Sequence, residues 1–289
     1  MERNAIVIKN LTKEINKVKA LDNISLTIHA GEIAGLAGPK ASGKSLITRA
    51  LVNLVKVDSG EISFFDHNIK KERDYIMNFV GYKPKEFVPF KNMTIKDYFK
   101  YSSKFYQGDY TNKIDELIDY FHLDKMKKLK ALSGEDLNII GIIDSLYFDP
   151  EVIIMDEVFN NLSHDNSSLV ISLLYSLKKR GRAIFVTSSN LHDLEFTDKK
   201  YLIKNGKLLN EDDVKKANKN YKSIIVKTKS IIKQEVLLKD SIKQLVLDDT
   251  RASFIFQGNL NDLIKILEKL DILDLEIDGP SLLEIYNVL

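Results

Sequence analysis

Eight residues near the N-terminus of this 289-residue sequence read GPKASGKS, and they occupy positions 38–45. They follow a short apolar run at residues 33–37 and precede a helical pattern that extends from Lys44 to about Val55. The segment fits the pattern G-x-x-x-x-G-K-[ST] and lies in the strand–turn–helix setting that gives this pattern its meaning. We therefore expect a phosphate-binding loop at this turn; the alternative is a glycine-rich turn that only begins a helix.

The loop has the chemistry that a nucleotide phosphate requires. Backbone N–H groups of residues 40–45 form a concave anion site at the N-terminus of a helix. Lys44 supplies a positive charge to the β- and γ-phosphates, and Ser45 offers a hydroxyl to Mg²⁺. The residues expected to contact ATP here are Gly38, Pro39, Lys40, Ala41, Ser42, Gly43, Lys44 and Ser45.

A second segment, VIIMDE at residues 152–157, supplies two carboxylates at the end of an apolar strand. Desolvation of these acids is costly, so a compensating cation or water is needed. We expect Asp156 to hold Mg²⁺ and Glu157 to orient or deprotonate the attacking water. A strand end with exposed acids is the alternative, and the phosphate-binding loop makes it the weaker one.

The composition excludes several other classes of protein. With 44% hydrophobic and 29% charged residues, the chain is an ordinary globular sequence. Its 43 basic and 41 acidic residues nearly cancel, which does not indicate a global nucleic-acid footprint. The absence of Cys excludes disulfides, iron–sulfur clusters and thiol catalysis. No apolar run approaches the ~18 residues of a membrane helix, and no signal peptide is visible. We expect a soluble, intracellular protein that reaches any membrane through a partner.

Two domains are expected along the chain. Strands and helices alternate over residues 1–218, where residues 5–9 and 24–28 are predicted strands and Asn205-Gly206 predicts a hairpin. The polar, charged stretch at residues 211–223 is typical of a linker. Residues 219–289 follow the order β-α-β-β-α-β, with a short final helix at residues 281–288, which suggests a small, ferredoxin-like α+β domain.

The segment LSGED at residues 132–136 opens a helix between the phosphate-binding loop and the two acids. ABC transporter nucleotide-binding subunits carry an LSGGQ signature at this place, and the sequence resembles that family over residues 5 to about 215. The segments at residues 81–84, 161–163 and 188–190 agree in spacing. The tail GPSLLEIY, at residues 279–286, is similar to the end of ATP-binding subunits of bacterial two-part drug, antibiotic and peptide exporters.

The resemblance implies a fold and a set of partners. The fold is an α/β P-loop NTPase with a mixed-sheet core and a helical subdomain at about residues 83–147, followed by the small α+β domain. Two such subunits clamp two ATP molecules head to tail, so that Ser133 and Gly134 of one signature contact the ATP held by the other subunit. The helical insert docks on a membrane-spanning partner. We therefore expect an ATPase at the cytoplasmic face of the cell membrane, with ATP and Mg²⁺ as its ligands.

Several positions depart from the family pattern. Where the family has an aromatic residue that stacks on adenine, this sequence has Ile15. Where the family has a glutamine that touches Mg²⁺ and water, it has Lys85. Glu135 replaces the second glycine of the family signature, and Ser163 replaces the aspartate that the family has in the turn at residues 161–163. Ile15 can still pack on adenine through an aliphatic contact, whereas Lys85 either competes with Mg²⁺ or neutralises phosphate charge. Asn190 stands where the family has the switch histidine, which contacts the γ-phosphate. Asparagine can donate a hydrogen bond but carries no charge.

Two questions stay open at these positions. If the alignment with the family is shifted by two residues, His192 occupies the switch position instead of Asn190. Glu135 adds a negative charge beside the nucleotide: two unit charges about 4 Å apart repel by about 4 kcal/mol at an effective dielectric near 20. That repulsion exceeds a helix-capping gain of about 0.3–1 kcal/mol unless Glu135 rotates away or a cation answers it. A heterodimer with a more intact ATPase is therefore favoured, and a homodimer is possible.

Three functional hypotheses follow from the resemblance. The first is an ATP-hydrolysing subunit that powers export of a toxic or antimicrobial peptide, an antibiotic or a lipid. The second is a hydrolysis-poor, ATP-binding regulatory module paired with a more active ATPase. The third is an ABC ATPase of translation or DNA repair, which a single phosphate-binding loop and the lack of a long coiled-coil insert make the weakest.

Overall fold

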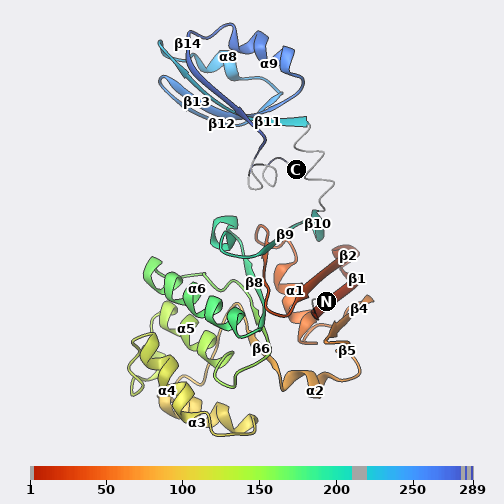
Figure 1. The fold of residues 1–289 in the computed structure, drawn as a ribbon, viewed down its shortest axis with the longest axis vertical. Coiled ribbons are helices and arrows are strands. Elements are labelled where there is room, and N and C mark those ends of the chain that lie inside the picture. Colours follow the sequence, from red (N-terminus) through yellow and green to blue (C-terminus); the bar gives the residue numbers. More distant parts are fainter. Residues whose placement is uncertain (1–2, 210–219, 281–283, 285–287, 289) are drawn as a thin grey trace. The chain divides into compact units, whose positions relative to one another are not determined.

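The structure is a computed structural model, and it describes residues 3–209, 220–280, 284 and 288. Most of the expected linker and nearly all of the expected final helix lie outside the described residues, as does most of the GPSLLEIY tail. The chain divides into two compact units, Met1–Leu208 and Leu209–Leu289 (Figure 1).

A six-stranded sheet forms the centre of the first unit, with the strand order β10-β9-β3-β8-β7-β6. The pairs that β3 makes with β8 and β9, and that β7 makes with β6 and β8, are all parallel. Every residue of β3 and β7 is buried, as expected for parallel strands covered on both faces. The strands are β3 (Ile33–Ala37), β6 (Val80–Lys83), β7 (Val152–Met155), β8 (Ala183–Ser188), β9 (Lys199–Lys204) and β10 (Lys207–Leu209).

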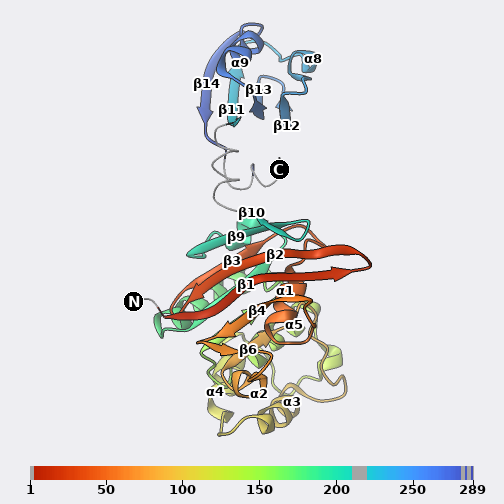
Figure 2. The same ribbon diagram turned by 90° about the vertical axis from the view of Figure 1, so that its right-hand side faces the viewer.

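An antiparallel sheet of order β2-β1-β4-β5 packs beside it. Its strands are β1 (Asn4–Ile15), β2 (Val18–His29), β4 (Ser59–Phe64) and β5 (His67–Asn68). The first two form the long hairpin that Figure 2 shows. Ile8 and Ile24 of this sheet belong to the same buried cluster as Leu51 and Ile154, so the two sheets share one hydrophobic core.

Helices cover both sides of the six-stranded sheet. Figure 1 shows α5 and α6 on one side of it, and α1 with β1 and β2 on the other. Between β6 and β7 the chain forms α3, α4 and α5, and α4 buries Ile114, Leu117 and Ile118 at helical spacing. The helices are α1 (Lys44–Leu51), α2 (Arg73–Met77), α3 (Ile95–Ser102), α4 (Thr111–Tyr120), α5 (Gly134–Asp144) and α6 (His164–Lys179), with 3₁₀ turns at Ser103–Phe105, Leu129–Ala131 and Leu191–Leu194.

The second unit has the element order β11-α8-β12-β13-α9-β14 and one antiparallel sheet of order β12-β13-β11-β14. This is the split βαβ arrangement of ferredoxin-like domains. Its own buried cluster includes Ile224, Phe254 and Leu263. The elements are β11 (Tyr221–Thr228), α8 (Gln234–Leu237), β12 (Ile242–Asp248), β13 (Arg251–Gln257), α9 (Leu260–Leu267) and β14 (Ile272–Asp278).

The predicted α/β architecture, with a sheet core and helices inserted between two of its strands, is confirmed. The element bounds differ in places. The helix predicted to reach about Val55 ends at Leu51, and the strands predicted at residues 5–9 and 24–28 are each twelve residues long. In the part of the chain that the structure describes, no helix is long and apolar enough to cross a membrane.

Candidate functional site

The loop between β3 and α1 leaves the N-terminus of α1 open. Gly43 is the N-cap residue with φ 111°, and within the described residues no side chain caps this helix end. The glycine is needed, because a Cβ there would lie 2.8 Å from Leu21 Cδ2 in a backbone conformation that L residues rarely adopt. A Cβ on Gly38 would lie 2.6 Å from the Ile203 carbonyl oxygen, so the loop also needs that glycine. With no acidic residue in the first turn, the helix end is suited to an external anion.

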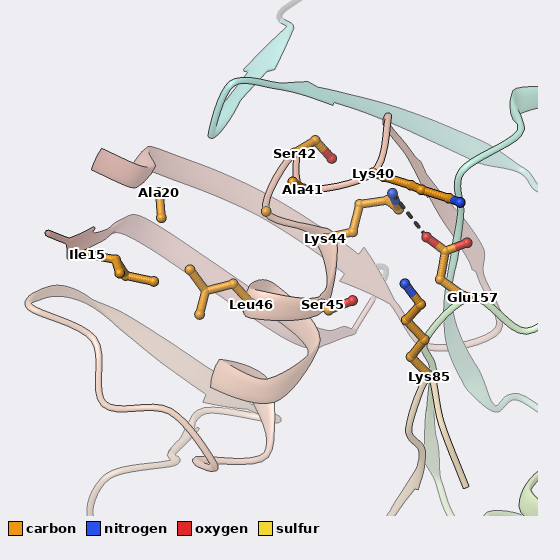
Figure 3. Close-up of a pocket in the computed structure, with 11 residues that line it drawn as sticks. Ile15, Ala20, Lys40, Ala41, Ser42, Lys44, Ser45, Leu46, Lys85 and Glu157 are labelled. Carbon is orange, nitrogen blue, oxygen red and sulfur yellow. Dashed lines mark ion pairs between the residues drawn. The ribbon is translucent and has the colours of Figure 1, made fainter. Parts of the chain in front are cut away.

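Lys44 and Glu157 form a buried ion pair at the mouth of this loop. The Lys44 Nζ lies 3.1 Å from Glu157 Oε1, and the exposed fractions of the two side chains are 4% and 9% (Figure 3). The ammonium also donates to the carbonyl oxygens of Gly38 at 2.6 Å and Pro39 at 3.0 Å. Two of the predicted phosphate-site residues therefore satisfy Lys44 rather than line the cavity.

Ser189 holds the Glu157 carboxylate from the other side. Its backbone N–H donates to Glu157 Oε2 at 2.9 Å and its hydroxyl donates to Oε1 at 2.6 Å. Burial on its own would raise the pKa of Glu157, but the hydrogen bonds from Ser189 and the charge of Lys44 outweigh it and lower the pKa. The carboxylate is thus ionised at neutral pH, as a general base must be.

Asp156 is fully buried and has an oxygen to spare. Its Oδ1 accepts a hydrogen bond from the Thr187 hydroxyl at 2.8 Å, and that hydroxyl accepts from the Glu157 N–H at 2.9 Å. Among the described residues, Asp156 Oδ2 has no hydrogen-bond partner. A buried carboxylate oxygen without a donor is unfavourable, so this atom fits a bound cation such as Mg²⁺.

Lys83 is a buried cation close to these acids. Its Nζ donates to the Asp156 carbonyl oxygen at 3.3 Å, and only 1% of the residue is exposed. Burial lowers the pKa of Lys83 to about 8, against the opposing charges of Asp156 and Glu157. The sequence indicated this lysine only as part of the spacing at residues 81–84.

A cavity of about 240 Å³ brings most of the predicted nucleotide contacts together. Figure 3 shows the Lys85 ammonium directed into it, toward the side that holds Glu157. Ile15 lies at the far end with 47% of its surface exposed, where an aliphatic contact with a base is possible. The predicted residues that line the cavity are Ile15, Lys40, Ala41, Ser42, Gly43, Lys44, Ser45, Lys85 and Glu157, and Ala20 and Leu46 join them.

Ser189, just after β8, lies at the site, although the sequence motifs gave it no role and assigned Asn190 instead. The Asn190 amide donates to Asp193 at 3.2 Å, and its oxygen accepts from the His192 N–H at 3.2 Å. His192 pairs with Glu195 at the surface. Ser189, instead, lies 3.3 Å from Lys44 Nζ and bonds Glu157. The available signal was topological: β8 lies between β3 and β7, so the residue after it must lie between the loop and the acids.

Ser133 and Gly134 lie apart from this cavity in the single chain. Ser133 is the N-cap of α5: its hydroxyl accepts from the Asp136 N–H at 3.0 Å, and the Asp136 carboxylate accepts from the Ser133 N–H at 3.2 Å. Gly134 lines a separate cavity of about 330 Å³ together with Lys85 and Asn138. This separation is compatible with a signature that serves the ATP of another subunit.

Glu135 is turned toward α6. Its Oε1 accepts from the Ser163 N–H at 2.8 Å, the Ser163 hydroxyl at 2.7 Å and the Asn166 amide at 2.6 Å. These donors, with Asn166 the strongest, lower the pKa of Glu135. Glu135 therefore faces its own chain. The predicted repulsion between Glu135 and a nucleotide then no longer supports an asymmetric pair of subunits.

Comparisons with known proteins agree with this geometry. A family model described as ABC transporter matches residues 21–160. The bacitracin transport ATP-binding protein BcrA of Bacillus licheniformis is 30% identical over 220 residues, which cover 73% of this chain and 72% of BcrA.

Solved structures show the same fold. The structure of an ATP binding subunit of an ABC transporter superposes with a TM-score of 0.67 at 18% identity, over 73% of this chain and 92% of that one. The dimeric structure of MJ0796, a bacterial ABC transporter cassette, gives 0.64 at 22% identity, over 71% and 97%.

The fold and the site together define a P-loop ATPase. More specifically, the chain belongs to the ABC transporter family as an ATP-binding subunit. It is thus an ABC-type ATPase, and subunits of this class dimerise and work with membrane-spanning partners.

Proposed function

We propose that this chain hydrolyses ATP to power export of a substrate through a separate membrane-spanning partner, at the cytoplasmic face of the membrane. The observation that carries the proposal is the buried Lys44–Glu157 pair at the uncapped N-terminus of α1. The similarity of this chain to a bacitracin transport ATP-binding protein supports an antibiotic, a toxic peptide or a lipid as the class of substrate.

The residues of the cavity divide the work of binding and hydrolysis. Phosphate oxygens accept from the N–H groups at the start of α1 and replace Glu157 as partners of Lys44, which frees the carboxylate to take a proton from water. Ser45 and Asp156 would hold Mg²⁺, which neutralises phosphate charge when bound. Ile15 packs on the base, and Asn190 would have to leave Asp193 to donate to the γ-phosphate.

A hydrolysis-poor regulatory module is the second candidate. The observation that favours it is Lys85, whose ammonium is directed into the cavity from the position where the family has a glutamine. The departures at Lys85 and Asn190 also favour pairing with a different ATP-binding subunit over a homodimer. Phosphate release by the pair that is unchanged when this chain carries Glu157→Gln would select this candidate over the first.

The test of ATP binding is Lys44→Ala. Loss of hydrogen bonds from a buried ammonium to phosphate should weaken MgATP binding by about 2 kcal/mol, or about thirtyfold in Kd. Isothermal titration calorimetry measures this, with Lys96→Ala as the control because Lys96 is an exposed lysine of α3. Equal MgATP affinity in Lys44→Ala and the unmodified chain would contradict the proposal.

We also propose that residues 1–218 form the ATP-binding domain, with a helical subdomain at about residues 83–147, and that residues 219–289 form an accessory domain. Separate buried clusters in the two compact units support this division. A chain that ends at residue 218 should bind MgATP with unchanged Kd. A well-folded truncation that no longer binds MgATP would show instead that the second unit completes the site.

A further inference from the structure

Two side chains of α5 hold the loop that carries Glu157. This β7–α6 loop comprises residues 156–163, between the end of β7 and the start of α6. Asn138, only 9% exposed, donates from its amide to the carbonyl oxygens of Val158 at 2.9 Å and Asn160 at 2.8 Å. Glu135 holds the far end of the loop through its three hydrogen bonds to Ser163 and Asn166. Because residues 135 and 138 are three apart on one helix, they share a face.

The loop needs such support because its first part is strained. Glu157 has φ 50°, a left-handed backbone conformation that is uncommon for residues other than glycine and asparagine. Non-glycine residues keep this conformation only where their surroundings over-determine it. The contacts from α5 act between Val158 and Asn166, immediately after the strained Glu157.

We propose that Glu135 is a positioning residue that, together with Asn138, ties the β7–α6 loop to α5, so that the signature segment and Glu157 move as one unit. The inference rests on the proposed role of Glu157 in hydrolysis. It gives one reason for two departures from the family pattern, Glu135 and Ser163. The carboxylate of Glu135 accepts from both the backbone N–H and the hydroxyl of Ser163. Glu135 thus acts through the loop and does not touch the nucleotide of its own cavity.

Amide hydrogen exchange on the full-length, nucleotide-free chain tests the tie directly. Glu135→Ala should accelerate exchange in peptides covering residues 157–166 by about tenfold or more, because it removes three hydrogen bonds to a charged acceptor. Glu135→Gln keeps an accepting oxygen without the charge and should give an intermediate rate. Glu151→Ala is the control, since Glu151 is an exposed acid just before β7 and lies outside any helix start.

Kinetics then separate positioning from general stability. In the form that hydrolyses ATP, alone or with its partner subunits, Glu135→Ala should lower kcat several-fold, and Glu135→Gln should recover part of it. The Kd for MgATP should stay within about twofold, because the cavity around Lys44 is unchanged. Exchange in peptides from β1 should also stay unchanged.

Three results would overturn the inference: unchanged protection of residues 157–166 in Glu135→Ala, an equal loss of protection in β1, or faster exchange with an unchanged kcat. The exchange arm needs no nucleotide. A failure of the proposed ATP site, seen as an unaltered Kd in Lys44→Ala, is therefore distinguishable from a failure of the tie.

Discussion

The helices α1 and α5 both begin directly after a loop that the sequence associates with nucleotide, yet their N-termini are satisfied in different ways. The first turn of α1 has Gly43 as its N-cap and no acidic residue. The first turn of α5 has the Ser133–Asp136 capping box and a further acid, Glu135. Unpaired N–H groups at a helix start attract an anion, and a carboxylate from the same chain fills that role equally well.

The difference assigns the two ends different tasks. At α1 the positive end of the helix is open to an external phosphate, and the buried Lys44 ammonium is held by Glu157 and by the carbonyl oxygens of Gly38 and Pro39. At α5 the chain's own acids complete the helix start, and Glu135 is directed to the loop that leads back to Glu157. Substitutions at α1 should therefore change ligand binding and chemistry, and substitutions at α5 should change geometry and stability.

The largest effect is expected for Glu157→Gln at the α1 end. Loss of the general base should lower kcat by a factor of about 100 or more. MgATP affinity should be retained or improved, because Lys44 no longer has a carboxylate to leave. Phosphate release and calorimetry measure the two quantities, and Glu151→Gln, an exposed acid just before β7, is the control. Turnover of Glu157→Gln at the rate of the unmodified chain would remove Glu157 from the mechanism.

Ser189→Ala gives the next largest effect. It removes the hydroxyl donor to Glu157 and keeps the N–H donor, so a loss of about 1 kcal/mol, or about fivefold in kcat, is expected. The hydroxyl favours the ionised form, so its removal raises the pKa of Glu157 and moves the acidic limb of the kcat profile to higher pH.

Asn190→Ala is the informative comparison for Ser189→Ala. If the geometry of the nucleotide-free chain persists during turnover, Ser189→Ala slows hydrolysis more than Asn190→Ala does. The reverse order would mean that Asn190 leaves Asp193 and takes the switch position that the sequence assigned to it.

The parts of the site that were predictable are the ones encoded by contiguous residues. The loop at residues 38–45 and the acids at residues 156–157 each lie within one strand and its following turn, so local pattern was sufficient. Ser189 contacts a residue 32 positions away, and Glu135 contacts residues 28 and 31 positions away. Those contacts depend on strand order and on how α5 packs, which no local pattern contains.

The fold shows the same division. The strand at residues 33–37 was predicted with the bounds that the structure has, because a buried parallel strand is a continuous apolar run. The strands β1 and β2 were predicted too short, because residues 10–15 and 18–23, on either side of the hairpin turn, are mostly exposed or half-buried and lack a regular apolar alternation. Cross-strand pairing such as Lys13 with Leu21 continues the hairpin where the apolar alternation has ended.

At the α5 end, Ser133→Ala should act on stability rather than on ligand. Removal of an N-cap hydroxyl lowers the free energy of unfolding by about 1 kcal/mol. Urea denaturation measures it, with Ser168→Ala on the exposed side of α6 as the control. The Kd for MgATP of the single chain should not change, because Ser133 does not line its cavity. A weaker Kd with unchanged stability would mean that the two helix ends are not divided as described.

The smallest effect concerns the pH dependence of the Glu135 contacts. Hydrogen bonds from Asn166 and Ser163 hold the pKa of Glu135 below its usual value in the folded chain. A carboxyl with a depressed folded pKa adds stability above its unfolded pKa and loses it as the pH falls through the folded pKa. The difference in unfolding free energy between the unmodified chain and Glu135→Ala should therefore be constant near neutral pH and shrink under acidic conditions. A difference for Glu135→Ala that is independent of pH would mean that the side chain contributes by packing and not through its charge.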